Sequence, residues 1–488
     1  MKKIYKFLVI MVLSLATMTA KAQNDGISLT LLPNLSYNNF YNPGVPVTSN
    51  AYFGIGLSNI SLSVYNSNIK YNNLYEFVGD KPVSFDANKF INSLDEHENF
   101  INTNFSLDIA RFGMRIGKFY ASFDWRLRYN GEFHYSRDFL GFFINGNGNY
   151  LGDNNPADFS IGVDVNTFTE MALGLQYQVN DKLTIGVRPK LLVGMVNVSV
   201  NDDDTKIYTD ANTYEMTADV NINIKASSIL KMDDVYRMSE YVEYIGGMDG
   251  LIFENIFDIK DNLGFGIDFG ASYIFNDNFG LSAGVYDLGF IKWKHSKEKH
   301  IHKDNVVVND ALIDDFEDLL NMELDFKELY TDLLENVWDN DSMYEGGSYK
   351  TSLKTRIMLQ GYYEFFPLVR LSAVTQLYYI NKQFRPAFTF AYSGSCWRVL
   401  NFTASYTLSK YSGNSIGAGV GVNLGPLNIY AVTDNIMIVS KVNASTMEML
   451  TSYNAANVRF GLVFSFGNNK KANKEKSDKS LGDLSDER

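Results

Sequence analysis

The chain of 488 residues contains 35 Phe, 31 Tyr and 37 Gly but only 9 Pro, a composition that favours pleated strands and excludes collagenous and fully disordered chains. Its net charge of −13 argues against nucleic acid as a partner, because neutralising phosphates needs clustered positive charge. The single cysteine, Cys396, excludes an intramolecular disulfide framework and metal sites built from several cysteines, and we expect no cofactor.

The N-terminus has the three regions of a secretory signal peptide, 1–22. Lysines within the first six residues precede the apolar run 7–16, and a small-residue motif predicts cleavage between Ala22 and Gln23. This run is too short to cross a bilayer as a helix, and no later stretch reaches about 18 uncharged apolar residues. A mature chain in a membrane would therefore have to be a closed β-barrel. Residues 23–50 would then form a plug-like segment.

Apolar residues alternate with small or polar ones through most of the remaining chain, which is the period of a β-strand. We expect the aromatic faces of these strands, with Phe265, Phe269, Phe402 and Phe460, to contact lipid. The pattern predicts fourteen strands, at 51–65, 102–115, 118–133, 168–179, 183–199, 263–275, 279–293, 351–364, 369–381, 385–394, 400–411, 415–424, 427–437 and 457–467.

The predicted connections alternate between long and short. Excursions at 66–101, 134–167, 200–262 and 294–350 are separated by tight turns such as 276–278. This asymmetry is typical of outer-membrane barrels, whereas a soluble Greek-key sandwich, which also alternates, gives no reason for it. We therefore expect a transmembrane antiparallel β-barrel over 51–467 in the cell outer membrane. Its partners would be lipid, lipopolysaccharide and the barrel assembly machinery, and residues 468–488 would form a disordered periplasmic tail.

The excursion 294–350 contains an acidic insert. Between Asp310 and Asp341 there are twelve carboxylates against one base, and leucines and aromatics recur at helical spacing. We predict two amphipathic helices over the outer mouth, packed on one another or on 200–262, or forming an apolar vestibule. His300-Ile301-His302 has no carboxylates at ligand spacing, so we expect no metal site.

No catalytic residue is predicted. His134 with Ser136 is a loose candidate for a hydrolase, and proximity in sequence does not establish a catalytic geometry. We therefore expect that the protein is not an enzyme.

Several segments carry a family resemblance. They are 281–293 with its Asp-Leu-Gly-Phe-Ile-Lys-Trp ending, Asn276-Asp277, Gly425-Pro426-Leu427, Tyr430, Thr433-Asp434-Asn435 and Arg459-Phe460-Gly461. Together they resemble the signature of an uncharacterised outer-membrane barrel family of the Bacteroidota. That family has no established activity, so the resemblance implies location and fold. More distantly, fourteen strands after a segment with Asn42-Pro43 resemble the long-chain fatty-acid transporters.

Pleat alternation predicts which side chains line the barrel lumen. They are Asp124, Arg126, Arg128, Arg188, Lys190, Asp268, Arg356, Gln360, Glu364, Arg370 and Arg459. Two interpretations remain open: a mutually paired network that fills the interior, or a selectivity lining for an anionic or amphipathic solute.

The strand 279–293 changes phase near Asp287-Leu288-Gly289. A β-bulge explains the change, and a lateral gate toward lipid is the alternative.

These features predict an outer-membrane barrel for passage or capture of a small hydrophobic or amphipathic solute. The alternative is a non-transporting barrel that serves as a surface scaffold or as part of a secretion or motility machine.

Overall fold

The computed structural model describes most of the chain between residues 26 and 468. The described residues are 26–33, 39, 41–67, 75–78, 81–97, 99–202, 204–228, 261–294, 296–308, 344–366, 369–380, 383–397, 399–409, 414–436 and 455–468. The signal peptide with its cleavage after Ala22, the two helices predicted between Asp310 and Asp341, and the polar tail lie outside these residues.

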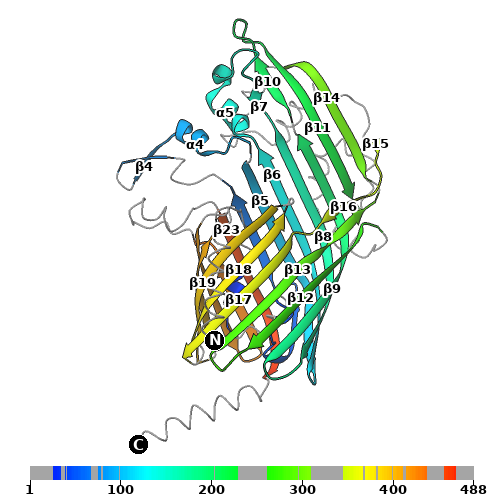
Figure 1. Ribbon diagram of the computed structural model, residues 1–488, viewed down its shortest axis with the longest axis vertical. Coiled ribbons are helices and arrows are strands. Elements are labelled where there is room, and N and C mark those ends of the chain that lie inside the picture. The colour runs from blue at the N-terminus through cyan, green and yellow to red at the C-terminus, as the bar shows by residue number, and fades with distance from the viewer. Residues whose placement is uncertain are drawn as a thin grey trace, which may run out of the picture.

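The chain folds into a closed antiparallel β-barrel of fourteen strands, as the alternation predicted (Figure 1). Each strand pairs with its neighbour in the sequence, and the first strand closes the barrel by pairing with the last. The strands are β1 (Ser49–Ile55) with β2 (Ile60–Asn66) as one interrupted strand, then β5 (Asn99–Ile116), β6 (Phe119–Tyr135), β8 (Ile161–Gln178), β9 (Leu183–Asp202), β12 (Leu263–Ile274), β13 (Phe279–Trp293), β17 (Thr355–Phe366), β18 (Val369–Ile380), β19 (Gln383–Cys396), β20 (Leu400–Leu408), β21 (Ser415–Leu424), β22 (Leu427–Thr433) and β23 (Ala455–Asn468).

The first strand is broken between β1 and β2. Both halves pair with β5 on one side and with β23 on the other, so the wall continues past the break. Gly56 has a φ of +63°, a left-handed conformation that glycine adopts without a steric penalty. The Leu57 carbonyl still accepts a hydrogen bond from the Leu462 amide, 2.8 Å away.

The outer face of the barrel is apolar. Phe265, Phe269 and Phe460 are 52%, 46% and 43% exposed, and they alternate with inward-facing small or charged residues. Phe402 is half-buried beside Tyr392, with ring centroids 5.9 Å apart. Large apolar side chains outside and polar ones inside are the arrangement of transmembrane barrels, the reverse of a water-soluble barrel.

On the long-loop side, β9 rises past the barrel and pairs with β11 (Met216–Ser228), which pairs in turn with β14 (Lys297–Val308) (Figure 1). Against this extension lie α5 (Arg137–Asn145), η2 (Asn147–Asn149), β7 (Ala157–Asp158) and β10 (Lys206–Thr209), and a cluster around Phe142 and Ile301 forms its core. The predicted helical loop 294–350 therefore begins with a strand. It also ends with two, β15 (Tyr344–Glu345) and β16 (Tyr349–Ser352), because these segments find pairing partners in β11, β14 and β13.

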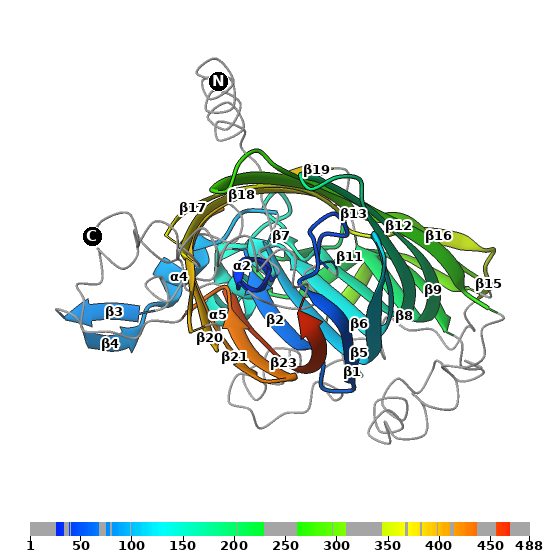
Figure 2. The same cartoon turned by 90° about the horizontal axis from the view of Figure 1, so that it is seen from below.

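The first long connection contains a hairpin of β3 (Tyr75–Val78) and β4 (Lys81–Phe85), followed by α4 (Ala87–Ser93). One further helix, α2 (Ile27–Leu31), lies inside the barrel, as the view along the barrel shows (Figure 2). Within the described residues no helix is long and apolar enough to cross a bilayer.

Candidate functional site

The short helix α2 is held against the inner wall of the barrel by one carboxylate. The amides of Gly26 and Ser28 each donate to Asp434, at 2.7 Å, and Asp434 lies at the end of β22. The carboxylate therefore satisfies amides that no side chain of the helix itself caps. The helix ends at Leu31, and Leu32 is extended because Pro33 disfavours the helical conformation in the residue that precedes it.

The next part of the N-terminal segment, 41–48, crosses the interior at two inward-facing glycines. A Cβ atom on Gly186 would lie 2.0 Å from the Pro43 carbonyl oxygen, and one on Gly270 would lie 2.2 Å from the Asn42 side chain. Gln176 donates from Nε2 to the carbonyls of Pro43 and Val45, both at 2.7 Å. The segment is thus fitted to the wall by close backbone approach and by hydrogen bonds. Its role as a plug stays a prediction.

Directly on the long-loop side of this segment lies a layer of ion pairs centred on Glu170, which is fully buried on β8. Its carboxylate lies 2.7 Å from Arg126, 3.1 Å from Arg128 and 3.3 Å from Arg188, and the Lys190 ammonium is 3.7 Å away. The buried carboxylate and the buried bases stabilise one another, because a charge left without a partner in such a place is costly.

Asp287 joins this layer through the irregularity predicted in 279–293. The pairing of β13 with β12 shifts register between Val285 and Leu288, and Asp287 has a φ of +54°. The extra residue turns the Asp287 carboxylate inward, where it receives both terminal nitrogens of Arg128, at 3.0 and 3.2 Å, and the Lys190 ammonium at 2.6 Å. Leu288 continues on the outer face, 50% exposed. The lateral gate stays a prediction.

A second group of ion pairs lies on β5 and β6. Arg111 contacts Asp108 at 2.6 Å and Asp124 at 3.0 Å, and Arg188 connects this group to the first through Asp124 at 3.4 Å. Asp108 and Arg111 can both face inward because β5 carries an extra residue between Asp108 and Ala110.

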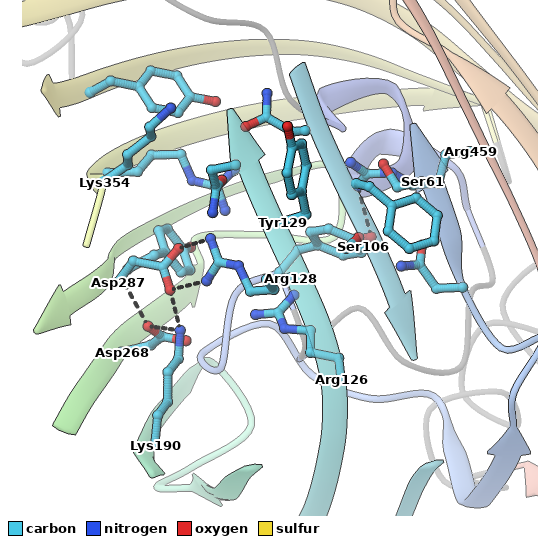
Figure 3. Close-up of a pocket in the computed structure, with 18 of the residues that line it drawn as sticks. Ser61, Ser106, Arg126, Arg128, Tyr129, Lys190, Asp268, Asp287, Lys354 and Arg459 are labelled. Carbon is cyan, nitrogen blue, oxygen red and sulfur yellow. Dashed lines mark hydrogen bonds and ion pairs between the residues drawn. The ribbon is translucent and has the colours of Figure 1, made fainter. Parts of the chain in front are cut away.

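Beside the ion-pair layer lies a half-open cavity of about 90 Å³ (Figure 3). Its lining has seven basic residues and two carboxylates, five aromatic side chains, three asparagines and two serines. The bases are Arg126, Arg128, Arg188, Lys190, Lys354, Arg356 and Arg459; the others are Asp268, Asp287, Tyr41, Phe105, Tyr129, Tyr286, Tyr378, Asn59, Asn104, Asn130, Ser61 and Ser106. The strand β9 runs from the short-turn side to the long-loop side, and Gly186 contacts the N-terminal segment. Arg188 and Lys190 follow Gly186 by two and four residues, so the cavity that they line lies on the long-loop side of that segment.

Two of the basic side chains lie against tyrosine rings. The guanidinium carbon of Arg356 is 4.8 Å from the ring centroid of Tyr286 and 6.0 Å from that of Tyr378. Arg459 lies 5.6 Å from the ring centroid of Tyr41 and donates to its hydroxyl at 2.9 Å. Stacking on aromatic rings holds a guanidinium in a fixed orientation.

The structure brings together most of the residues predicted to line the lumen. Asp124 lies behind the cavity, and seven others line it: Arg126, Arg128, Arg188, Lys190, Asp268, Arg356 and Arg459. Gln360, Glu364 and Arg370 stand apart toward the short-turn end, where Arg370 pairs with Glu364 at 2.9 Å. Ion pairs hold six of the central residues, Asp124, Arg126, Arg128, Arg188, Lys190 and Asp268, and the choice between a filling network and a selectivity lining stays a prediction.

Sequence reasoning missed several members of the site. Glu170 and Lys354 lie near the beginnings of the predicted strands 168–179 and 351–364 and were not singled out, Asp108 and Arg111 need the β5 bulge to share a face, and Tyr41 lies in the N-terminal segment. The available signal for Glu170 was that it shares the parity of Gln176 and is the one charged residue in the predicted strand 168–179.

Outside the barrel, the described residues contain no group of three or more His, Cys, Asp or Glu placed to hold a metal ion. His300 and His302 stack on the exposed face of β14, with ring centroids 6.4 Å apart. His97 lies 3.0 Å from Asp158, and this hydrogen bond raises the pKa of the imidazole. Partial burial raises the pKa of Asp158, but hydrogen bonds from Ser160 and His97 outweigh it and lower the pKa overall.

A family model matches residues 43–434, which include all of the cavity lining except Tyr41 and Arg459. The chain belongs to the family of unknown function DUF5723. A search of curated proteins finds no match.

Several solved structures are similar to this DUF5723 protein. A Pseudomonas aeruginosa FadL homologue is 11% identical with a TM-score of 0.43, over 90% of this chain and 95% of that one. The Pseudomonas putida toluene transporter TodX is 9% identical with a TM-score of 0.38, over 92% and 98%. The translocator domain of the autotransporter NalP from Neisseria meningitidis is 8% identical with a TM-score of 0.32, over 85% and 89%.

Proposed function

We propose that this protein is an outer-membrane β-barrel that takes up a small amphipathic solute from the long-loop side. The observation that carries the proposal is the cavity, which is lined by polar and aromatic side chains and lies on the long-loop side of the N-terminal segment. The apolar outer face of the strands supports the membrane location, because such a surface is stable only against hydrocarbon. A solute that enters the cavity would meet the N-terminal segment before it could leave at the short-turn side.

Passage then requires the N-terminal segment to move. Asp434, Gln176 and Ser272 hold that segment through hydrogen bonds with its backbone, and Leu29 and Leu32 pack in a buried cluster.

In the described residues the segment 26–48 pairs with no barrel strand, so it can rearrange while the paired wall remains intact.

Liposome swelling with the full chain tests the proposal, beside a variant that lacks residues 23–48. We expect slow solute entry with the full chain and faster entry with the shortened one. If both sets of liposomes remain sealed, transport is refuted. Fractionation of cell envelopes tests the location, and recovery of the protein in the soluble fraction without detergent would refute it.

The dense filling of the interior favours a second candidate, a barrel that anchors a surface scaffold. The extension formed by β9, β11 and β14 offers a folded platform beyond the barrel. Co-purification of a stoichiometric protein partner, together with sealed liposomes, would favour the scaffold over the transporter.

A further inference from the structure

We infer that the cavity recognises a compact oxyanion, a carboxylate or a phosphate group, carried on a polar or aromatic body rather than on an acyl chain. The inference rests on the proposed function, since it concerns the solute of the same cavity. It follows from three properties of the cavity, which are the absence of aliphatic lining, the excess of positive charge and the small volume.

Among the residues that the structure describes, the cavity is lined by no aliphatic side chain. Its apolar surface comes from one phenylalanine and four tyrosine rings, and the remaining residues are charged, amide or hydroxyl side chains. An acyl chain would leave these polar groups without hydrogen-bond partners, at a cost for each of them. A polar body with hydroxyl or amide groups, or an aromatic ring, would instead pair with the amides and stack on the tyrosines.

The charge of the lining is strongly positive, with seven bases and two carboxylates. Carboxylates behind the lining offset part of this excess: Glu170 contacts four of the bases, Asp124 contacts Arg188, and Glu132 lies 3.6 Å from Lys354. Even with these three counted, seven bases face five carboxylates. A site of this kind attracts anions, and low-dielectric barrel walls concentrate its field.

One arginine of the lining, Arg356, lies beside two tyrosine rings, with its guanidinium carbon 4.8 Å from the ring centroid of Tyr286 and 6.0 Å from that of Tyr378. Arg459 differs, because it donates from Nη1 to the Tyr41 hydroxyl and from Nε to the Ser61 hydroxyl. When a ring covers the flat face of a guanidinium, its N–H groups still point outward in the guanidinium plane, which is the geometry that matches two oxygens of a carboxylate or phosphate.

The volume limits what can enter. A cavity of about 90 Å³ is smaller than the roughly 150 Å³ cavity known to hold benzene, so it accommodates an oxyanion head and little more. Because the cavity is half-open, the body of the ligand can extend out of it.

The test uses the full chain in a non-ionic detergent and isothermal titration calorimetry with three probes, benzoate, its neutral isostere benzamide, and inorganic phosphate. We expect benzoate to bind at least about tenfold more tightly than benzamide, because its carboxylate can accept a charge-assisted hydrogen bond from a guanidinium and the neutral amide cannot. Binding of phosphate alone would identify a free phosphate as the ligand, whereas binding of benzoate without phosphate would identify a carboxylate on an aromatic body.

The variant Arg356→Gln should lose about tenfold or more in benzoate affinity, and Arg356→Lys should recover part of it. Arg370→Gln is the matched control, because Arg370 also lies in the barrel but pairs with Glu364 away from the cavity. Each variant is checked for folding by its heat-dependent gel mobility, and Lys354→Met replaces Arg356→Gln if that variant does not fold.

Three outcomes would overturn the inference: benzoate and benzamide that both bind with the same affinity, an equal loss in Arg370→Gln, or no binding of either anion. Its failure can be told apart from failure of the proposed function. If the liposomes stay sealed but benzoate binds, the transport proposal is refuted and the anion site is retained. If solute enters but no anion binds, the anion site is refuted and the transport proposal is retained.

Discussion

The substitution Glu170→Gln removes the negative charge at the centre of the ion-pair layer. Glu170 is fully buried and lies within 3.7 Å of four bases. Two of them, Arg188 and Lys190, are themselves almost fully buried, so solvent cannot replace the lost carboxylate for them. Breaking a buried ion pair by removing one partner costs about 3–5 kcal/mol, because the other charge stays buried. We therefore expect the equilibrium constant for unfolding to rise by about a hundredfold to several thousandfold.

The assay is urea unfolding in detergent micelles, followed by tryptophan fluorescence and by the mobility of the folded barrel on unheated gels. Glu364→Gln is the control. Glu364 is also buried, but its ion pair is with Arg370, whose side chain is 40% exposed and can be solvated, so the control should lose about 1 kcal/mol or less. Equal midpoints for the two variants would refute the argument that Glu170 holds the layer together.

Three further predictions concern the N-terminal segment and the loops. Asp434→Ala removes the acceptor for two amides and should expose that segment to added protease; unchanged cleavage would contradict the anchoring role. Gly270→Val should displace the segment and raise single-channel conductance, whereas Gly266→Ala, whose Cβ would meet no atom nearer than 3.3 Å, should leave conductance unchanged; equal traces would argue against the close approach. The raised pKa of His97 predicts that its ion pair with Asp158 stabilises the loops. As the pH rises, this stabilisation is complete up to about pH 6.5 and is lost through the raised pKa of the imidazole. As the pH falls, it is lost when Asp158 takes up a proton, which its lowered pKa places below about pH 3.8. An NMR titration of His97 should show a midpoint above about 6.5 that returns to that value in Asp158→Asn, and an unshifted midpoint in the wild-type chain would refute the pair.

The location of the central charges could be read largely from local parity. Arg126, Arg188 and Lys190 lie on long, regular strands, where alternation decides which face a side chain occupies. Which carboxylate meets which base could not be read in this way. Glu170 and Asp287 come from strands far apart in the sequence, and the register between strands places them together.

The amino-acid sequence by itself determined the barrel, its fourteen strands and the division into apolar outer and polar inner faces, because a two-residue period and the lengths of the connections are local properties. The tertiary structure alone decided the bulges at Asp108 and Asp287, the path of the N-terminal segment and the cavity beside it. Part of the site depends on barrel closure, since Arg128 on β6 meets Asp287 on β13 only when strands that are not neighbours in the sheet are brought within hydrogen-bonding distance.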